Sequence, residues 1–249
     1  MKKITYVSIL ALIAVVMLIP VLSGAKKVTV SMTDINKTIA TETTQRDTIV
    51  EEQENFAALY ELLELDKKGL DKNTFDIAIT GYNKLSEAGK IKNNKLSIVD
   101  FSQPSTKKRL YIIDMQNKKL LFHTLVAHGK NSGNVIANKF SNTNESLQSS
   151  LGFYVTAEKY QGKHGLSMRM DGMEKTNSNA RARAIVVHGA NYVSEQFVKS
   201  TGYLGRSWGC PAVNPALNEP IINAIGNGSA LFIYSPQADY VAQSSLISR

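Results

Sequence analysis

Hydrophobic and polar positions divide the 249-residue chain into an apolar start, a polar stretch and a long patterned remainder. Lys2 and Lys3 precede a nearly unbroken apolar run over residues 4–22, and the small residues Ser23-Gly24-Ala25 follow it. A positive start, an apolar centre and small residues before a cleavage point are typical of a signal peptide. The run is also near bilayer-spanning length, so an N-terminal membrane anchor stays open as the alternative. Either way, we expect an exported protein of the periplasm or cell envelope.

A change from irregular to helical patterning follows. Residues 26–50 are rich in Thr, Ser and charge and show little periodicity, which predicts a flexible tether. Apolar positions then recur at helical spacing and predict helices at about Glu52–Leu65 and Lys72–Ala88. Asp71 is placed to cap the second helix, and Gly89 to end it. These helices are expected to form a packing layer or a lid.

From Lys95 onward, short apolar runs separated by turn residues predict strands. The expected strands are Leu96–Phe101, Arg109–Asp114, Leu120–Ala127, Gly152–Ala157, Ala184–Val187 and Ala230–Tyr234, with a short helix at Asn214–Ile225. The pattern predicts a mainly β fold with flanking helices. Residues 128–150 form a long polar stretch, and a loop of that length in a compact domain is usually functional or mobile.

The pattern predicts four parts along the chain. They are a signal peptide or anchor (1–25), a flexible tether (26–50), a helical N-terminal segment (51–90) and a β-rich domain (91–249) that contains the candidate catalytic residues described below. About 180 residues are enough to bury one sizeable core.

Charge and composition exclude several classes of function. The formal net charge is +8, but the charges are scattered and form no basic stripe with interleaved aromatic residues, so nucleic acid is not an expected partner. The four histidines and the single cysteine lack the paired spacing of a metal site. No phosphate-binding glycine loop follows a strand. We therefore expect no metal and no cofactor.

The single cysteine, Cys210, is the strongest candidate for chemistry. Most lone cysteines are buried packing residues, but a free thiol is unusual in an exported chain. His188 ends an apolar run upstream, so its imidazole is expected at the rim of a sheet, where it could activate the thiol. Ser207 and Gly209 just before the cysteine favour a turn whose backbone N–H groups could face a developing oxyanion.

These residues resemble a known family. His188-Gly189, a spacer, and Ser207-Trp208-Gly209-Cys210 are similar to the signature of the YkuD-type L,D-transpeptidases of bacterial cell walls. The string S-W-G-C-P-A-V is typical of the branch of murein L,D-transpeptidase catalytic domain proteins. The resemblance spans roughly Asp71 to Tyr234. It implies a β-sandwich or barrel-like mixed sheet of the L,D-transpeptidase type.

The resemblance also implies a reaction. Cys210 would attack a peptidoglycan tetrapeptide stem, release D-Ala and form a thioester, with His188 as general base and then acid. Ser207 and Gly209 would belong to the catalytic turn, and a backbone carbonyl would orient His188. A second stem would resolve the thioester into a 3-3 crosslink. Hydrolysis by an L,D-carboxypeptidase and a non-catalytic wall-binding protein remain the alternatives.

A set of residues around the motif is expected to bind substrate. Family members line the donor groove with two elements that resemble Ala127–Lys130 and Ser149–Phe153 here, although a polar insertion separates them in this chain. The residues at 160–165 resemble a wall of that groove. For the loop histidines and the arginine, a solvated surface role is an equal alternative. The protein is expected to be a monomer whose partners are donor and acceptor stem peptides. The candidate substrate-binding residues are Gly189, Arg206, Trp208, His128, Tyr160 and His164.

Overall fold

The computed structural model describes residues 55–247, which belong to one compact unit. The predicted targeting segment (1–25) and tether (26–50) lie outside the described residues, so both stay predictions. Within 55–247, no helix has the length and apolar character needed to cross a membrane. The motif residues His188 and Cys210 both lie inside the described part.

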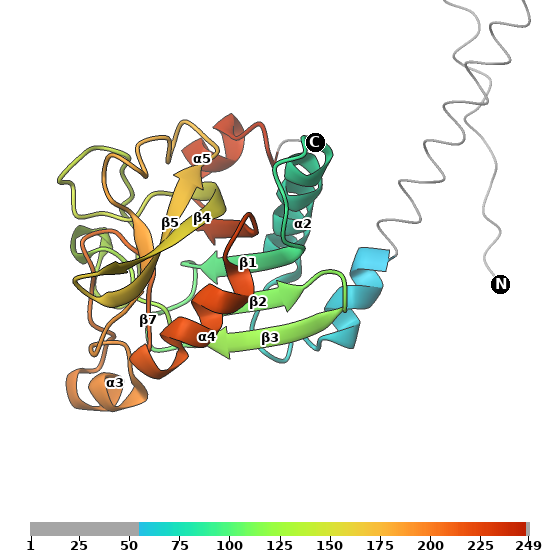
Figure 1. The fold of residues 1–249 in the computed structure, drawn as a ribbon. Coiled ribbons are helices and arrows are strands. Elements are labelled where there is room, and N and C mark those ends of the chain that lie inside the picture. Colours follow the sequence, from blue (N-terminus) through green and yellow to red (C-terminus); the bar gives the residue numbers. More distant parts are fainter. Residues whose placement is uncertain (1–54, 248–249) are drawn as a thin grey trace, which may run out of the picture. The chain divides into compact units, whose positions relative to one another are not determined.

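Eight strands of the described range form one mixed sheet, in the order β3-β2-β1-β8-β4-β5-β6-β7 (Figure 1). Neighbouring strands are antiparallel except for two parallel pairs, β1 with β8 and β6 with β7. This architecture confirms the predicted fold class, mainly β with flanking helices. The strands are β1 (Lys95–Asp100), β2 (Leu110–Asp114), β3 (Lys119–Thr124), β4 (Gly152–Gly162), β5 (Gly165–Gly172), β6 (Val186–Gly189), β7 (Ala212–Val213) and β8 (Ala230–Tyr234).

Helices flank the sheet and begin and end at recognisable signals. The Asp71 side chain accepts a hydrogen bond from the Thr74 N–H at 3.1 Å, which confirms the predicted cap. Gly89 adopts φ +66° one residue beyond the C-cap, as expected for a helix-ending glycine. The helices are α2 (Lys72–Glu87), α3 (Glu195–Thr201), α4 (Pro215–Ile225) and α5 (Ala238–Gln243), with a 3-10 turn η1 (Lys130–Ser132), and residues 55–62 are also helical.

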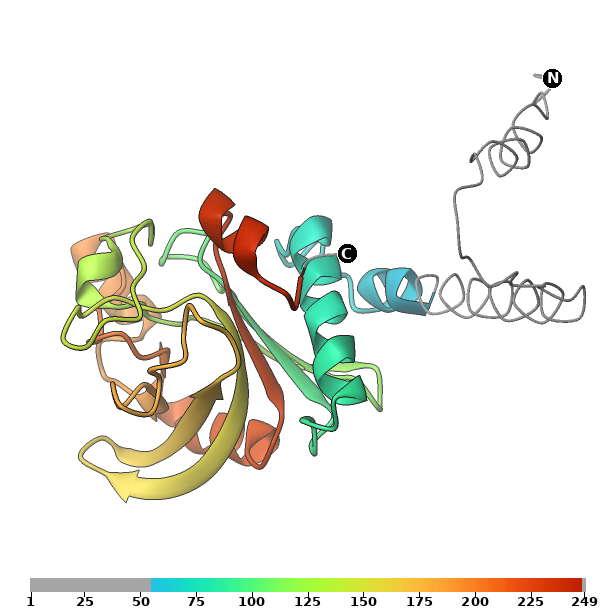
Figure 2. The same cartoon turned by 90° about the horizontal axis from the view of Figure 1, so that it is seen from above.

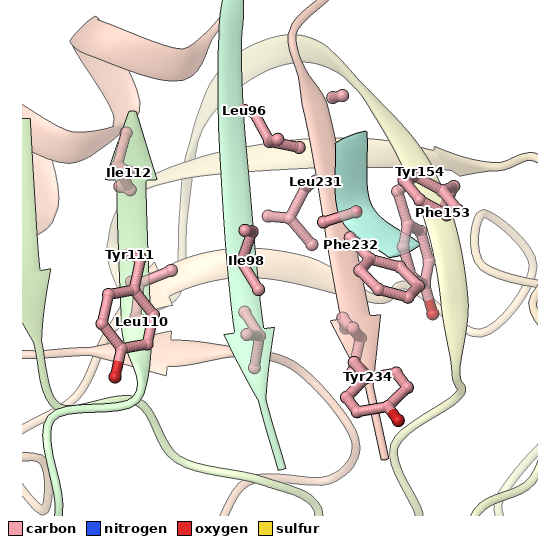
Figure 3. Close-up of a cluster of buried hydrophobic side chains, with 14 of the residues drawn as sticks. Leu96, Ile98, Leu110, Tyr111, Ile112, Phe153, Tyr154, Leu231, Phe232 and Tyr234 are labelled. Carbon is pink, nitrogen blue, oxygen red and sulfur yellow. The ribbon is translucent and has the colours of Figure 1, made fainter. Parts of the chain in front are cut away.

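The core lies between α2 and the middle of the sheet. α2 contacts β1 and β8, and Figure 2 shows it on one side of β8 with the β4–β5 hairpin on the other. Phe153 of β4 stacks on Phe232 of β8 with ring centroids 4.1 Å apart, and both rings are fully buried (Figure 3). β2 and β8 are buried along their whole length, because structure covers both faces of these strands.

The second half of the sheet curves strongly. β4 and β5 form a long hairpin that rolls away from α2 in Figure 2, so the sheet approaches a barrel. α4 packs against β1, β5 and β6. The hairpin and α4 therefore hold β6, the strand that contains His188, from two sides.

Several elements differ from the sequence prediction. β6 begins at Val186 rather than 184, because Ala184 has φ +52°, which an extended strand does not permit. The strand predicted to run to Ala127 ends at Thr124. Missing from the prediction were β5, β7, α3 and α5. β5 alternates apolar and polar residues and joins β4 through a two-residue turn, whereas the predicted strand ended at Ala157.

Gly81 of α2 is a position where one added methyl group should lower the stability of the fold. A Cβ there would lie 2.1 Å from the Phe153 ring, which is clamped against Phe232. Gly81→Ala gains about 1 kcal/mol in helix propensity. Overpacking a clamped core site costs about 1–3 kcal/mol. We expect a lower free energy of unfolding in urea. Ser86→Ala, on the exposed side of the same helix, should change it by less than about 0.5 kcal/mol. Equal stability of the two variants would contradict this packing.

Candidate active site

The turn that carries Cys210 is braced by Ser207. The buried Ser207 hydroxyl donates to the Cys210 carbonyl at 2.6 Å and accepts from the Gly209 N–H at 3.1 Å. Its backbone N–H donates to the His128 carbonyl, and its own carbonyl accepts from Lys130. Ser207 therefore closes the turn and ties it to the backbone of residues 128–130.

Gly209 is required by the shape of the same turn. Its φ of +127° lies in the region that favours glycine, and a Cβ there would lie 2.7 Å from the Gln148 carbonyl oxygen. The Gly209 N–H is occupied by Ser207, so it is not available for an oxyanion. The Cys210 N–H makes no hydrogen bond to any residue in 55–247, which leaves it as the available donor.

The Cys210 thiol is held against the start of β6. Its Sγ accepts from the Val186 N–H at 3.4 Å and donates to the Ala184 carbonyl at 3.6 Å. Burial raises the pKa of the thiol, while the Val186 N–H and the positive charge of Arg183 act in the opposite direction. The thiol is therefore protonated at neutral pH in the free protein.

His188 is oriented by a backbone carbonyl. Its Nδ1 lies 2.9 Å from the Gly189 carbonyl oxygen, and a carbonyl only accepts, so Nδ1 carries the proton. Nε2 is then left with its lone pair. Burial lowers the pKa of His188, the Gly189 carbonyl raises it and His164 lowers it, so the ring is neutral at pH 7. A neutral imidazole with a free Nε2 can act as a general base.

The strand register brings the thiol and the imidazole to one edge of the sheet. His188 of β6 pairs with Ala212 of β7, two residues beyond Cys210, and the Cys210 Sγ contacts Val186, two residues before His188. No hydrogen bond joins the two side chains directly among the described residues. Catalytic hydrogen bonds are often long in free enzymes and tighten when substrate binds.

The β4–β5 hairpin forms a wall beside His188. Tyr160 pairs with Ser167, and Ser167 pairs with His188, so the three side chains share one face of the sheet. The exposed His164 ring, in the hairpin turn, stacks on His188 with centroids 4.7 Å apart. The structure therefore brings Tyr160 and His164 to the candidate site.

His128 lies elsewhere than the sequence suggested. Its ring is 0% exposed, Nδ1 accepts from Arg109 at 2.7 Å and Nε2 contacts the Gly133 carbonyl at 3.1 Å. Burial, together with the nearby Arg109 charge, lowers its pKa to about 4. With both ring nitrogens occupied, His128 is placed to support the core, and this placement argues against the expected substrate contact.

Three other predicted residues border the turn. Arg206 braces the loop after His128 by donating to the Gly133 carbonyl at 3.3 Å and to Asn134. Trp208 is 77% exposed beside Cys210 and is free to contact a ligand. Gly189 packs against α4, where a Cβ would lie 3.2 Å from Asn218, and its carbonyl orients His188.

The sequence did not indicate a role for Arg183, or that the long polar loop is held by hydrogen bonds to this side chain. The Arg183 guanidinium donates to the Ser141 carbonyl at 2.7 Å and to the Gln148 carbonyl at 2.6 Å. Ser132, Ser149 and Ser150 are buried, so the stretch 128–150 is a packed loop. The Arg-Ala-Arg-Ala sequence before β6 was the available signal. No group of three or more potential metal ligands occurs in residues 55–247.

Comparison with known proteins identifies the family. The model of the L,D-transpeptidase catalytic domain family matches residues 66–234, and the chain belongs to this family. This range contains every predicted site residue and confirms the resemblance found in the motif at family level. No curated protein matches the chain significantly.

Solved structures of L,D-transpeptidases are distantly similar. An enzyme from Mycobacterium smegmatis has 14% identity and a TM-score of 0.36, covering 57% of this chain and 59% of its own. One from Mycobacterium tuberculosis has 14% identity and a TM-score of 0.35, covering 57% and 58%. One from Enterococcus faecium has 12% identity and a TM-score of 0.35, covering 58% and 50%. The chain thus spans between half and three fifths of the length of these relatives.

The protonation state of the thiol can be measured by alkylation, because Cys210 is the only cysteine. Burial raises its pKa, so the rate of iodoacetamide labelling should rise with pH and reach half its maximum above the ordinary thiol value of about 8.5. Cys210→Ser should abolish labelling. A midpoint below pH 7 would instead indicate a preformed thiolate–imidazolium pair.

The two histidines predicted for substrate should differ in stability measurements. His128→Ala leaves Arg109 without one of its partners in a fully buried site, so the free energy of unfolding should fall by about 2–4 kcal/mol. His164→Ala, at an exposed turn, should stay within about 0.5 kcal/mol of wild type in the same denaturation experiment. An unchanged stability of the His128 variant would refute its structural role.

Proposed function

We propose that this chain is a cysteine-dependent peptidoglycan L,D-transpeptidase that uses Cys210 as nucleophile and His188 as general acid–base. The observation that carries the proposal is the joint placement of these two groups at the β6–β7 edge. The Cys210 thiol lies against β6, the strand that contains His188. The neutral imidazole of His188 has no hydrogen bond at Nε2 within the described residues. Membership of the L,D-transpeptidase catalytic domain family supports the same reaction class.

The first half of the reaction forms a thioester. The donor is a tetrapeptide stem whose scissile bond joins a diamino acid, at its third position, to D-Ala. His188 Nε2 takes the proton from Cys210 as Sγ attacks the carbonyl carbon, because both groups start neutral. The free Cys210 N–H donates to the oxyanion. Nε2 then protonates the departing D-Ala amine, and the thioester remains.

The second half transfers the acyl group. The side-chain amine of a diamino acid on another stem attacks the thioester, His188 accepts its proton, and Cys210 leaves as the thiol. The product is a 3-3 crosslink. The exposed Trp208 adjoins Cys210 in the chain, and the wall formed by Tyr160 and His164 lies beside His188, so these residues are the proposed contacts of the two peptide stems. The apolar N-terminal run supports placement of the enzyme in the periplasm or cell envelope, with its N-terminus either cleaved or anchored.

Mass spectrometry of a defined reaction tests this proposal. Full-length protein, kept in mild detergent because of its apolar N-terminal run, is incubated with a disaccharide-tetrapeptide. We expect loss of D-Ala and a crosslinked dimer, both absent with Cys210→Ser. His188→Ala should slow the reaction by roughly 10²–10⁴-fold. His123→Gln, a histidine on β3 that stacks on Tyr111, is the matched control and should leave the rate unchanged.

Other outcomes point to the alternatives. Loss of D-Ala without a dimer would make the protein an L,D-carboxypeptidase. An unchanged substrate, combined with retention on intact sacculi by wild type and by Cys210→Ser, would replace the enzyme with a wall-binding protein.

A further inference from the structure

We infer that Arg183 is a positioning residue for the nucleophile, supplying a fixed positive charge behind Cys210 that stabilises the thiolate formed during reaction. This inference deepens the proposed function and rests on Cys210 being the nucleophile. It concerns a residue that lies outside the His-Gly and Ser-Trp-Gly-Cys segments.

Arg183 lies directly behind the catalytic turn. It precedes Ala184, whose carbonyl accepts the hydrogen bond from the Cys210 thiol. One guanidinium nitrogen, Nη2, is 3.3 Å from the position that a Cβ on Gly209 would occupy. The cation therefore packs against the backbone immediately before the nucleophile.

The hydrogen-bond partners of Arg183 are all uncharged. Nη1 donates to the Ser141 carbonyl and to the Ser150 hydroxyl, and Nη2 donates to the Ser146 hydroxyl at 3.1 Å and to the Gln148 carbonyl. Within residues 55–247, no carboxylate forms an ion pair with this side chain. These contacts hold the guanidinium in place without neutralising its charge.

Arg181, two residues earlier, shows the opposite arrangement. Its guanidinium forms ion pairs with Glu158 and Asp171 on the β4–β5 hairpin. Its charge is matched by carboxylates and lies largely in solvent, where salt screens it. The Arg-Ala-Arg-Ala segment thus contains one compensated and one uncompensated cation, and the uncompensated one adjoins the thiol.

The coupling between Arg183 and Cys210 is reciprocal. Burial lowers the pKa of Arg183, the charges of Tyr154 and then Cys210 raise it, and the Arg183 charge lowers the pKa of the thiol. Tyr192 is the other titratable group affected by the thiol, and its pKa is raised mainly by burial. His188, on β6, stays neutral. Arg183 is therefore the cation that opposes the cost of forming a thiolate in this buried position.

The test is the pH profile of Cys210 alkylation in full-length protein, which needs no knowledge of substrate. A neighbouring opposite charge lowers a thiol pKa by roughly one unit, so Arg183→Gln should slow iodoacetamide labelling about tenfold below the midpoint. It should also move the midpoint upward. Arg183→Lys keeps the charge and should restore most of the labelling rate.

Two controls separate charge from loop order. Arg181→Gln removes the compensated cation and should leave the profile unchanged. Ser146→Ala removes one hydrogen bond of the Arg183 guanidinium but keeps its charge, and should also leave the profile unchanged. Neither Ser146 nor Arg181 belongs to the proposed catalytic machinery.

Two results would overturn the inference. An unshifted profile in Arg183→Gln would show that the cation has no effect on the thiol. An equal slowing in Arg183→Lys and Arg183→Gln would show that only the geometry of the guanidinium matters. If Arg183→Gln does not fold, Arg183→Lys still tests the inference, because labelling about tenfold slower than wild type in that variant would show that a positive charge at this position does not assist the thiol. A failure to release D-Ala would count against the proposed function and not against this coupling.

Discussion

The hydrogen bonds of the Ser207 hydroxyl are the interaction on which the rest of the site depends. One short side chain satisfies the Gly209 N–H and the Cys210 carbonyl, and its backbone fastens the turn to residues 128–130. Because Gly209 can adopt a positive φ, the turn is tight enough to direct the Cys210 thiol onto β6. Ser207 occupies the Gly209 N–H, and the Cys210 N–H makes no hydrogen bond within residues 55–247, so the brace also determines which donor of the turn stays available.

Burial governs the electrostatics of this edge. It raises the pKa of the thiol and lowers that of His188, so both groups rest in their neutral forms. A neutral thiol and a neutral imidazole do not form an ion pair at rest. When the proton moves from the thiol to the imidazole, the two new charges must be stabilised by neighbouring groups. In the proposed reaction, that stabilisation comes from the Gly189 carbonyl, which hydrogen-bonds His188, and from the cation of Arg183, which packs against Gly209.

The sequence predicted those elements whose signal is local. Apolar spacing and a capping aspartate suffice for α2, and unbroken apolar runs suffice for β1, β2 and β8. β7 has two residues and no pattern of its own, since it exists by pairing with β6 and by a bridge from Ala212 to Ala127. His128 looks like a loop histidine because its partner, Arg109, is brought to it by tertiary packing. Arg183 was missed for the same reason, since its partners lie in a loop that folds back from residues 141–150.

The position of β8 has a consequence for how the chain acquires its shape. β8 lies between β1 and β4, so the last strand joins the half-sheet β3-β2-β1 to the half-sheet β4-β5-β6-β7 that contains the site. Pairing between segments so distant in sequence is slow, because a long loop must close before any contact forms. Because the ribosome makes the N-terminus first, the sheet cannot be completed until Tyr234, the last residue of β8, has been synthesised. Cys210 is therefore synthesised before the strand that completes the sheet around it.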